Sequence, residues 1–206
     1  MPVKIKMCGM TRPEDAEKAS KLGVDAIGII LSEMDMENIF DRYVEKYQAM
    51  KIIEAVPDEV RKIGVFVNED PERINSLVEI LDLDFVQLHG EEGPEDFKKI
   101  HCDIIKTVKV TGADSLNDLD RFKVKALLLD GKKGGSGESF DWEFLKEFQS
   151  KIPWFLAGGL NPDNITRAIQ KYSPDWVDIS SGIEGSVKGE KDADKMKRLI
   201  DAVRNT

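Results

Sequence analysis

The sequence predicts an α/β protein whose strands and helices alternate along the whole chain, as in a (βα)8 barrel (TIM barrel) of minimal length. Eight short apolar runs lie between segments of helical periodicity, and most of these runs have Val, Ile, Leu or Phe at consecutive positions. Strands that are buried on both faces of a parallel sheet have this pattern. The 206 residues leave about 26 for each of eight units, which is enough for a barrel with short loops.

The eight predicted strands occupy residues 3–7, 25–31, 62–67, 85–88, 104–108, 126–129, 154–157 and 176–179. The same alternation is compatible with an open, doubly wound parallel sheet. Such a sheet usually has fewer strands and often carries a G-x-G-x-x-G turn after the first one. Here the first turn, residues 8–11 (CGMT), lacks that spacing, so the closed barrel is favoured. No linker or change in composition divides residues 1–206, and we expect a single domain.

About eight helices are expected between the strands, and four of them have recognisable ends. Thr11 and Glu14 have the spacing of a capping box at the start of the first helix. Asp70-Pro71 and Asn161-Pro162 predict two further helix starts, and the last helix is expected over residues 191–203. The inner faces of these four helices are predicted to be Ala16, Ala19 and Leu22; Ile74, Leu77, Val78 and Leu81; Ile165, Ala168 and Ile169; and Met196, Leu199, Ile200 and Val203.

Composition and charge exclude several classes of protein. The net charge of −9 is unsuited to nucleic-acid binding, which needs a basic face. No window approaches the ~20 apolar residues of a membrane span, and the first residues lack the pattern of a signal peptide. Two cysteines, Cys8 and Cys102, and two histidines offer no metal-ligand spacing. We expect a cytoplasmic protein with no bound metal, and both a monomer and a homodimer remain open.

In a (βα)8 barrel the loops that follow the strands form the working face. Glycines let a phosphate approach the backbone, and helix-terminal amides bind its charge. Taken alone, the glycines of either loop would fit a tight turn better than a binding site, but together the loops after the seventh and eighth strands predict a phosphate site. The residues of these two loops are Gly158, Gly159, Ser180, Ser181 and Gly182.

A further glycine-rich run covers residues 134–137 (GGSG). It is not a nucleotide-binding loop, because Glu138 stands where a Walker loop needs Lys and the G-x-G-x-x-G spacing is absent. A loop that closes over the substrate and a plain flexible connection both remain compatible with it.

Cys8 and Asp130 each follow an apolar run and differ from the other strand-end residues in their chemistry. A thiol that faces the pocket could act as a base if its pKa is lowered, and a carboxylic acid opposite it would complete an acid–base pair. The plainer interpretations are a buried small side chain for Cys8 and a cap or hydrogen-bond anchor for Asp130. Cys102 precedes a strand and fits a structural role. The sequence has neither a nucleophile elbow nor a Ser/His/Asp order, so nothing in it indicates a hydrolase.

Five motifs follow one another at successive strand ends. They are residues 6–11 (KMCGMT), 86–90 (VQLHG), 129–142 (with LD, GGSG and FDW), 157–164 (AGGLNPDN) and 177–184 (VDISSGIE). Together they resemble the phosphoribosylanthranilate isomerases, and the likeness extends from residue 3 to about residue 200. The resemblance implies a (βα)8 barrel that catalyses the third step of tryptophan synthesis from anthranilate. That reaction is an Amadori rearrangement, an aldose–ketose isomerisation, which needs neither cofactor nor metal.

The resemblance also implies roles for individual residues. Asp130 would be the general acid that protonates the ribose ring oxygen, and Cys8 the general base that removes the proton from C2′. Ring opening needs a neutral acid and C–H abstraction needs a base, so the two groups must hold opposite protonation states. Gln87, His89 and Asp178 match positions near the substrate, and the two glycine-containing loops match the phosphate loops of the family.

The segment after the second predicted strand departs from the family pattern. Relatives have a short S-x-R-x-V segment there, whose arginine holds the anthranilate carboxylate. Arg42 is the counterpart in this chain, and an arginine fork suits a carboxylate. Residues 33–41 carry four acidic side chains, which fit a solvated face pointing away from an anionic substrate. We nevertheless expect a local positive field at the pocket.

Two other functions compete with this hypothesis. The related isomerase of the histidine pathway would be expected to use two aspartates at its strand ends, whereas the first strand here ends in Cys8. A barrel that binds phosphate without catalysis would not need the Cys8 and Asp130 pair.

Overall fold

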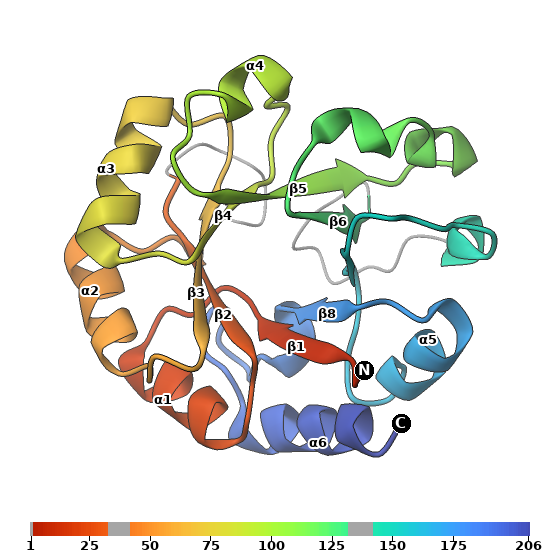
Figure 1. Cartoon of the computed structure of the whole chain (residues 1–206). Coiled ribbons are helices and arrows are strands. Elements are labelled where there is room, and N and C mark those ends of the chain that lie inside the picture. Colours follow the sequence, from red (N-terminus) through yellow and green to blue (C-terminus); the bar gives the residue numbers. More distant parts are fainter. Residues whose placement is uncertain (1, 33–41, 132–141) are drawn as a thin grey trace.

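The computed structural model describes residues 2–32, 42–131 and 142–206. Eight parallel strands close into a barrel in chain order, with β1 paired to β8 (Figure 1). The strands are β1 (Lys4–Met7), β2 (Ala26–Ile30), β3 (Arg61–Phe66), β4 (Phe85–Leu88), β5 (Asp103–Lys109), β6 (Ala126–Asp130), β7 (Trp154–Leu156) and β8 (Trp176–Ile179). The predicted barrel is confirmed, and every predicted strand agrees with an observed one to within one residue at each end.

The helices lie outside the barrel (Figure 1). The expectation of about eight is wrong for the described residues, which contain six α-helices. Between β5 and β6 the chain forms two 3-10 turns, Ala113–Leu116 and Leu119–Phe122, instead of an α-helix. Asp118 and Lys123 have positive φ there, a conformation that interrupts a right-handed helix. The helices are α1 (Pro13–Lys21), α2 (Lys46–Glu54), α3 (Pro71–Leu81), α4 (Pro94–Phe97), α5 (Ile165–Tyr172) and α6 (Ala193–Arg204).

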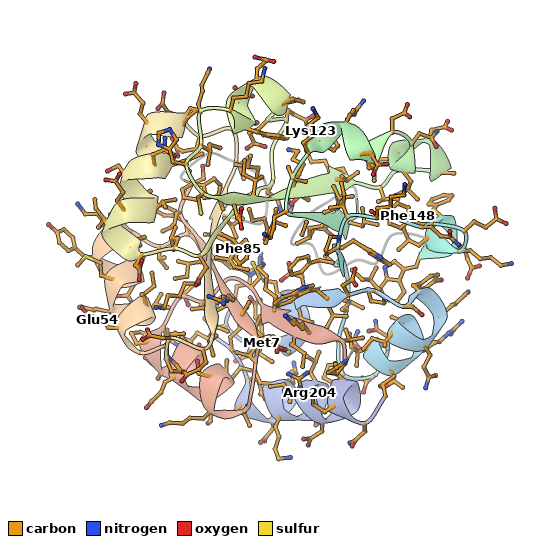
Figure 2. All side chains as sticks on the ribbon, in the orientation of Figure 1. Met7, Glu54, Phe85, Lys123, Phe148 and Arg204 are labelled. Carbon is orange, nitrogen blue, oxygen red and sulfur yellow. The ribbon has the colours of Figure 1, made fainter. Side chains whose placement is uncertain are left out.

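Alternate residues of each strand face opposite sides of the sheet, and both sides are buried. Ile5, Met7 and Val177 belong to the outer layer, which packs against the helices. Ile63 and Leu128 belong to an inner cluster, and side chains fill the space that the strands enclose (Figure 2). This double burial explains why most of the strands are apolar at consecutive positions.

The predicted helix starts are confirmed in one case and wrong in two. Asp70 caps α3 as expected, since its carboxylate accepts from the backbone N–H of Glu72 at 2.7 Å. The capping box at Thr11 does not form, because its hydroxyl donates to the Gly189 carbonyl at 2.7 Å and α1 starts two residues later. The side chain of Asn161 closes a turn of its own, so α5 begins only at Ile165.

The predicted inner faces of these four helices are buried, apart from Leu22 and Val78, which are partly exposed. No helix in the described part of the chain is long and apolar enough to cross a membrane.

Gly64 in β3 lies where there is no room for a larger side chain. An added Cβ would meet Cδ1 of Leu83 at 2.6 Å and Cε2 of Phe66 at 2.8 Å. Overpacking of this kind costs about 1–3 kcal/mol, so Gly64→Ala should lower the free energy of unfolding by about that amount in urea titrations. Gly112→Ala is the control, because nothing lies within 4 Å of its added Cβ. Equal losses in the two variants would contradict the packing argument.

Candidate active site

The candidate residues of the sequence lie at one end of the barrel, because the carboxyl ends of parallel strands share an edge. Cys8 follows β1, Asp130 ends β6 and Asp178 lies in β8. Gln87 lies in β4, and His89 follows that strand directly. These residues are far apart in the sequence, yet the interior of the barrel brings their side chains into one cluster of hydrogen bonds and charges.

A lysine that the sequence analysis did not single out lies at the centre of this cluster. The side chain of Lys6 is wholly buried, and its Nζ donates to Oδ1 of Asp178 at 2.8 Å. Burial acts to lower the pKa of Lys6, but Asp178 and Cys8 outweigh it and raise that pKa, so the group remains an ammonium. The alternation of Lys6 and Cys8 with apolar Ile5 and Met7 was the signal in the sequence, because period 2 places both polar side chains on one face.

Cys8 is a buried free thiol. Burial raises the pKa of this thiol, and the nearby Asp178 carboxylate adds to the increase. The cations of Lys6 and Lys191 act in the opposite direction and favour the thiolate. The ionisation of Cys8 therefore depends on a balance between desolvation and two lysines.

Asp130 is a buried carboxyl group at the end of β6. Burial raises its pKa to about 6, against the opposing effects of Lys6 and of the Gly131 N–H, which donates to Oδ1 at 2.7 Å. The carboxylate of Asp178 raises it further. A carboxyl group in this range can hold a proton close to neutral pH and release it during a reaction.

His89 is neutral, because burial and neighbouring lysines lower its pKa to about 3. Its Nε2 lies 3.6 Å from Oδ2 of Asp130, which is too long for a hydrogen bond and is not an ion pair with a neutral ring. On the other side of the ring, Nδ1 lies 3.1 Å from Nε2 of Gln87 and 3.3 Å from the Thr107 hydroxyl. Among the described residues, His89 Nε2 and Gln87 Oε1 have no hydrogen-bond partner, so both can serve a bound ligand.

Arg42 is buried beside the cysteine end of β1 and is held by a carboxylate that the sequence analysis did not assign. Its Nε and Nη2 donate to Glu184 at 2.5 and 2.8 Å. Lys191 also contacts Glu184, at 3.1 Å, and donates to the Ser180 carbonyl at 3.2 Å. Despite burial, the two cations hold the pKa of Glu184 below its usual range. Glu184 is the last residue of the 177–184 motif, and its partners could not be read from its position in the chain.

The two predicted phosphate loops contact each other. Gly158 and Gly159 have φ of 80° and 69°, a left-handed conformation that favours glycine. A Cβ on Gly182 would stand 1.9 Å from the Leu160 carbonyl oxygen, so only glycine permits this approach between the loops after β7 and β8. The structure thus joins both loops into one surface at the working end of the barrel.

Several other expectations concern metal sites, Cys102 and two loops. The acidic segment 33–41 and the glycine-rich run 134–137 lie outside the described residues. Cys102 is half-buried, and its sulfur approaches the carbonyls of Leu83 and Asp84, in agreement with a structural role. Within the described part of the chain, no group of three His, Cys, Asp or Glu side chains is placed to hold a metal ion.

A closed parallel barrel that buries a thiol, a carboxyl group of raised pKa and a lysine near both is equipped to move protons to and from a bound molecule. The fold and the site together define a (βα)8-barrel enzyme of the acid–base type.

The comparison with known proteins identifies the family within this class. The model of the N-(5'-phosphoribosyl)anthranilate (PRA) isomerase family matches residues 5–202, and this chain belongs to that family. The chain is 40% identical over 201 residues to the N-(5'-phosphoribosyl)anthranilate isomerase of Citrifermentans bemidjiense, which covers 96% of this chain and 95% of that protein. The resemblance found in the sequence is confirmed.

Two solved structures agree with this assignment. Phosphoribosyl anthranilate isomerase from Thermotoga maritima has a TM-score of 0.88 and 35% identity, over 99% of this chain and 100% of that one. A second structure has a TM-score of 0.82 and 34% identity, over 99% and 100% of the two chains. It is a phosphoribosyl anthranilate isomerase in complex with reduced 1-(o-carboxyphenylamino)-1-deoxyribulose 5-phosphate.

The raised pKa of Asp130 has a consequence for stability. The folded protein binds the proton of Asp130 more tightly than the unfolded chain does. The stability that this proton contributes is complete below about pH 4 and is lost as the pH rises through about 6. At about pH 8 the buried carboxylate destabilises the fold, and Asp130→Asn should raise the free energy of unfolding by about 2–3 kcal/mol in urea titrations.

At about pH 4 the same substitution should have little effect, because the carboxyl group is then neutral in the folded protein. Asp120→Asn, at an exposed aspartate, is the control for the chemical change itself. A loss of stability in Asp130→Asn at the higher pH would show that the buried carboxylate does not destabilise the folded protein.

Proposed function

We propose that this isomerase converts N-(5'-phosphoribosyl)anthranilate into 1-(2-carboxyphenylamino)-1-deoxyribulose 5-phosphate, with Asp130 as general acid and Cys8 as general base. The observation that carries the assignment is the pairing, inside one barrel end, of a carboxyl group with a pKa of about 6 and a thiol beside two lysines. Family membership supplies the reaction, and the geometry supports the roles of the two residues.

The first chemical step opens the ribose ring. Neutral Asp130 gives its proton to the ring oxygen while the bond from that oxygen to C1′ breaks. The lone pair of the anthranilate nitrogen then forms a double bond to C1′, which gives a protonated Schiff base. The proton can be held near neutral pH because burial raises the pKa of Asp130 to about 6.

The second step removes the proton from C2′. The thiolate of Cys8 takes that proton, and the electron pair of the C–H bond moves towards the iminium nitrogen, which yields an enolamine. Protonation at C1′ and loss of the proton from the 2′-hydroxyl convert the enolamine into the ketone. One residue gives a proton and the other removes one, so the site needs two groups in opposite protonation states.

The remaining candidates bind the substrate in this proposal. Arg42 faces the anthranilate carboxylate, and the bidentate grip of Glu184 on Nε and Nη2 fixes the plane of its guanidinium group. Asp178, Gln87 and His89 lie near the sugar, where the two buried polar atoms without partners can be satisfied. The phosphate binds the joined loops, which contain Gly158, Gly159, Ser180, Ser181 and Gly182.

The partner of this protein is therefore a small phosphosugar, and the chain works as a monomer or a homodimer. Cys8 must remain a free thiol to act as a base, and reducing compartments preserve such thiols, so we place the protein in the cytoplasm.

An assay of turnover tests the reaction and the two roles together. The protein should consume freshly generated N-(5'-phosphoribosyl)anthranilate, as a change in the fluorescence of the anthranilate group. Cys8→Ala and Asp130→Asn should each lower kcat by about 100-fold or more, because general acid–base catalysis contributes that much. No turnover by the unmodified protein would refute the isomerase proposal, and a variant with near-normal kcat would refute the role of that residue.

The dependence of kcat/KM on pH should have an unusual assignment. The active form, with Asp130 protonated and Cys8 ionised, holds as many protons as the more abundant form in which the two are reversed. The active form is therefore a small and constant fraction of the protein at every pH between the two pKa values. We expect kcat/KM to rise through about pH 6 with Asp130, stay level, and fall where the thiol ionises, above its ordinary range.

The thiolate absorbance, followed over the same pH range, distinguishes the two limbs. It should appear along the upper, falling limb. Its appearance along the lower limb would assign that limb to Cys8 and contradict the reversed protonation.

A further inference from the structure

Lys6 places a positive charge among the reacting groups, and the reaction described above does not use it. Its side chain is wholly buried, so it has no access to solvent. The register between β1 and β8 puts Lys6 directly opposite Asp178, and the two side chains form an ion pair of 2.8 Å. A buried ammonium costs free energy even when it is paired, so its presence here points to a role beyond stability.

Lys6 and Cys8 share a space that Gly28 of β2 leaves open. A Cβ on Gly28 would stand 2.7 Å from Sγ of Cys8, 3.0 Å from Nζ of Lys6 and 3.1 Å from its Cε. A side chain at this position would be too close to the sulfur and would push the end of Lys6 aside. The missing side chain lets the ammonium group come within hydrogen-bonding reach of the sulfur.

We propose that Lys6 is a positioning residue of the isomerase: its ammonium group, anchored by Asp178, stabilises the thiolate of Cys8 and so provides the base that takes the C2′ proton. This inference rests on the proposed function and adds to it the origin of the base. Lys6 keeps its own protons throughout, and the proton from C2′ ends on the sulfur.

The other charges around the sulfur set the size of this effect. Burial is the main reason that the pKa of Cys8 is raised, and Lys6 is the strongest opposing group. Asp178 acts with burial, while Lys191, which approaches from the segment after β8, acts with Lys6. Asp130 faces Lys6 from β6, and Lys6 lowers its pKa too.

His89, after β4, is another titratable group whose pKa Lys6 lowers, and its ring stays neutral over the working pH range. It therefore contributes no change of charge that could be mistaken for the titration of Cys8. Besides burial, the charges that act on the ionisation of the thiol are those of the two lysines and Asp178.

The two members of the ion pair should move the thiol titration in opposite directions. Lys6→Met removes the cation that favours the thiolate, so the midpoint should rise by about one pH unit or more. Asp178→Asn removes an anion that disfavours it, so the midpoint should fall. If the pair served only to hold the fold together, the two substitutions would not shift the midpoint of the thiol in opposite directions.

The experiment follows the ultraviolet absorbance of the thiolate against pH, with the absorbance of Cys8→Ala subtracted so that Cys102 does not contribute. Lys6→Met should also raise the pKa of Asp130, which Lys6 lowers. On the level part of the pH profile, kcat/KM of Lys6→Met should therefore be about tenfold lower for each pH unit by which the rise in the thiol midpoint exceeds the rise in the pKa of Asp130. Lys6→Arg, which keeps the charge, should retain a midpoint close to that of the unmodified protein. A midpoint unchanged in Lys6→Met would overturn the proposal.

Lys106→Met is the matched control. Lys106 in β5 is also a buried strand lysine, and its Nζ lies 2.9 Å from Oε2 of Glu92. The next residue, Thr107, contacts Gln87 inside the barrel, so alternation turns Lys106 to the outer face of the strand, away from Cys8. Its replacement should reduce stability much as Lys6→Met does, yet leave the midpoint of the thiol and kcat unchanged. Equal shifts in both variants would assign the effect to general destabilisation and overturn the proposal.

A second comparison applies if Lys6→Met does not fold, since that variant leaves Asp178 buried without its partner. The double variant Lys6→Met/Asp178→Asn has no unpaired buried charge, and it is compared with Asp178→Asn alone. A higher midpoint in the double variant supports the role of Lys6, and an equal or lower one refutes it.

These titrations need no turnover, so the two proposals can fail separately. A shifted thiol midpoint without any isomerase activity in the unmodified protein would refute the proposed function, and the role of Lys6 in that reaction with it, while leaving the coupling of the two groups. Normal turnover with an unmoved midpoint would refute the role of Lys6 alone.

Discussion

The parallel pairing of β1 with β8 closes the barrel, and its register determines which side chains share the interior. In that register Lys6 lies opposite Asp178, and Met7 lies opposite Ile179. The first pair meets inside the barrel as ammonium and carboxylate, whereas the second joins the apolar layer beneath the helices. A slip by one residue would turn Lys6 into that apolar layer without its partner, because side chains alternate with a period of two. Closure of the sheet and placement of the site are thus one constraint.

Two buried cations at the working end of this barrel are each paired with a carboxylate. Lys6 pairs with Asp178, and Arg42 pairs with Glu184. Such pairs add little to stability, because desolvation offsets most of their attraction, but removing one partner is costly. Their effect is to hold fixed charges around the reacting groups in a medium that water does not screen. An enzyme that stabilises changing charge benefits from a field that is already oriented.

The sequence predicts most of the fold because local patterns determine it, and it fails where distant contacts prevail. Most of the strands are apolar on both faces, and Asp70 caps its helix through neighbouring amides, so both follow from adjacent residues. Thr11 has an equally good local signal, but its hydroxyl bonds to Gly189, 178 residues away. The segment between β5 and β6 forms 3-10 turns because residues such as Asp118 adopt positive φ, which the pattern of apolar residues does not reveal.

The sequence by itself determined which residues carry reactive groups and that Cys8 and Asp130 follow strands of a barrel, since strand order and side-chain alternation are properties of the chain. Only the tertiary structure decided their environment. Asp178 is 172 residues from Lys6, and Glu184 is 142 residues from Arg42, yet both pairs are in hydrogen-bond contact. The pKa of Asp130 rises to about 6 because the closed barrel removes water from it. Desolvation and Coulomb forces act through space, so neither can be read from positions along the chain.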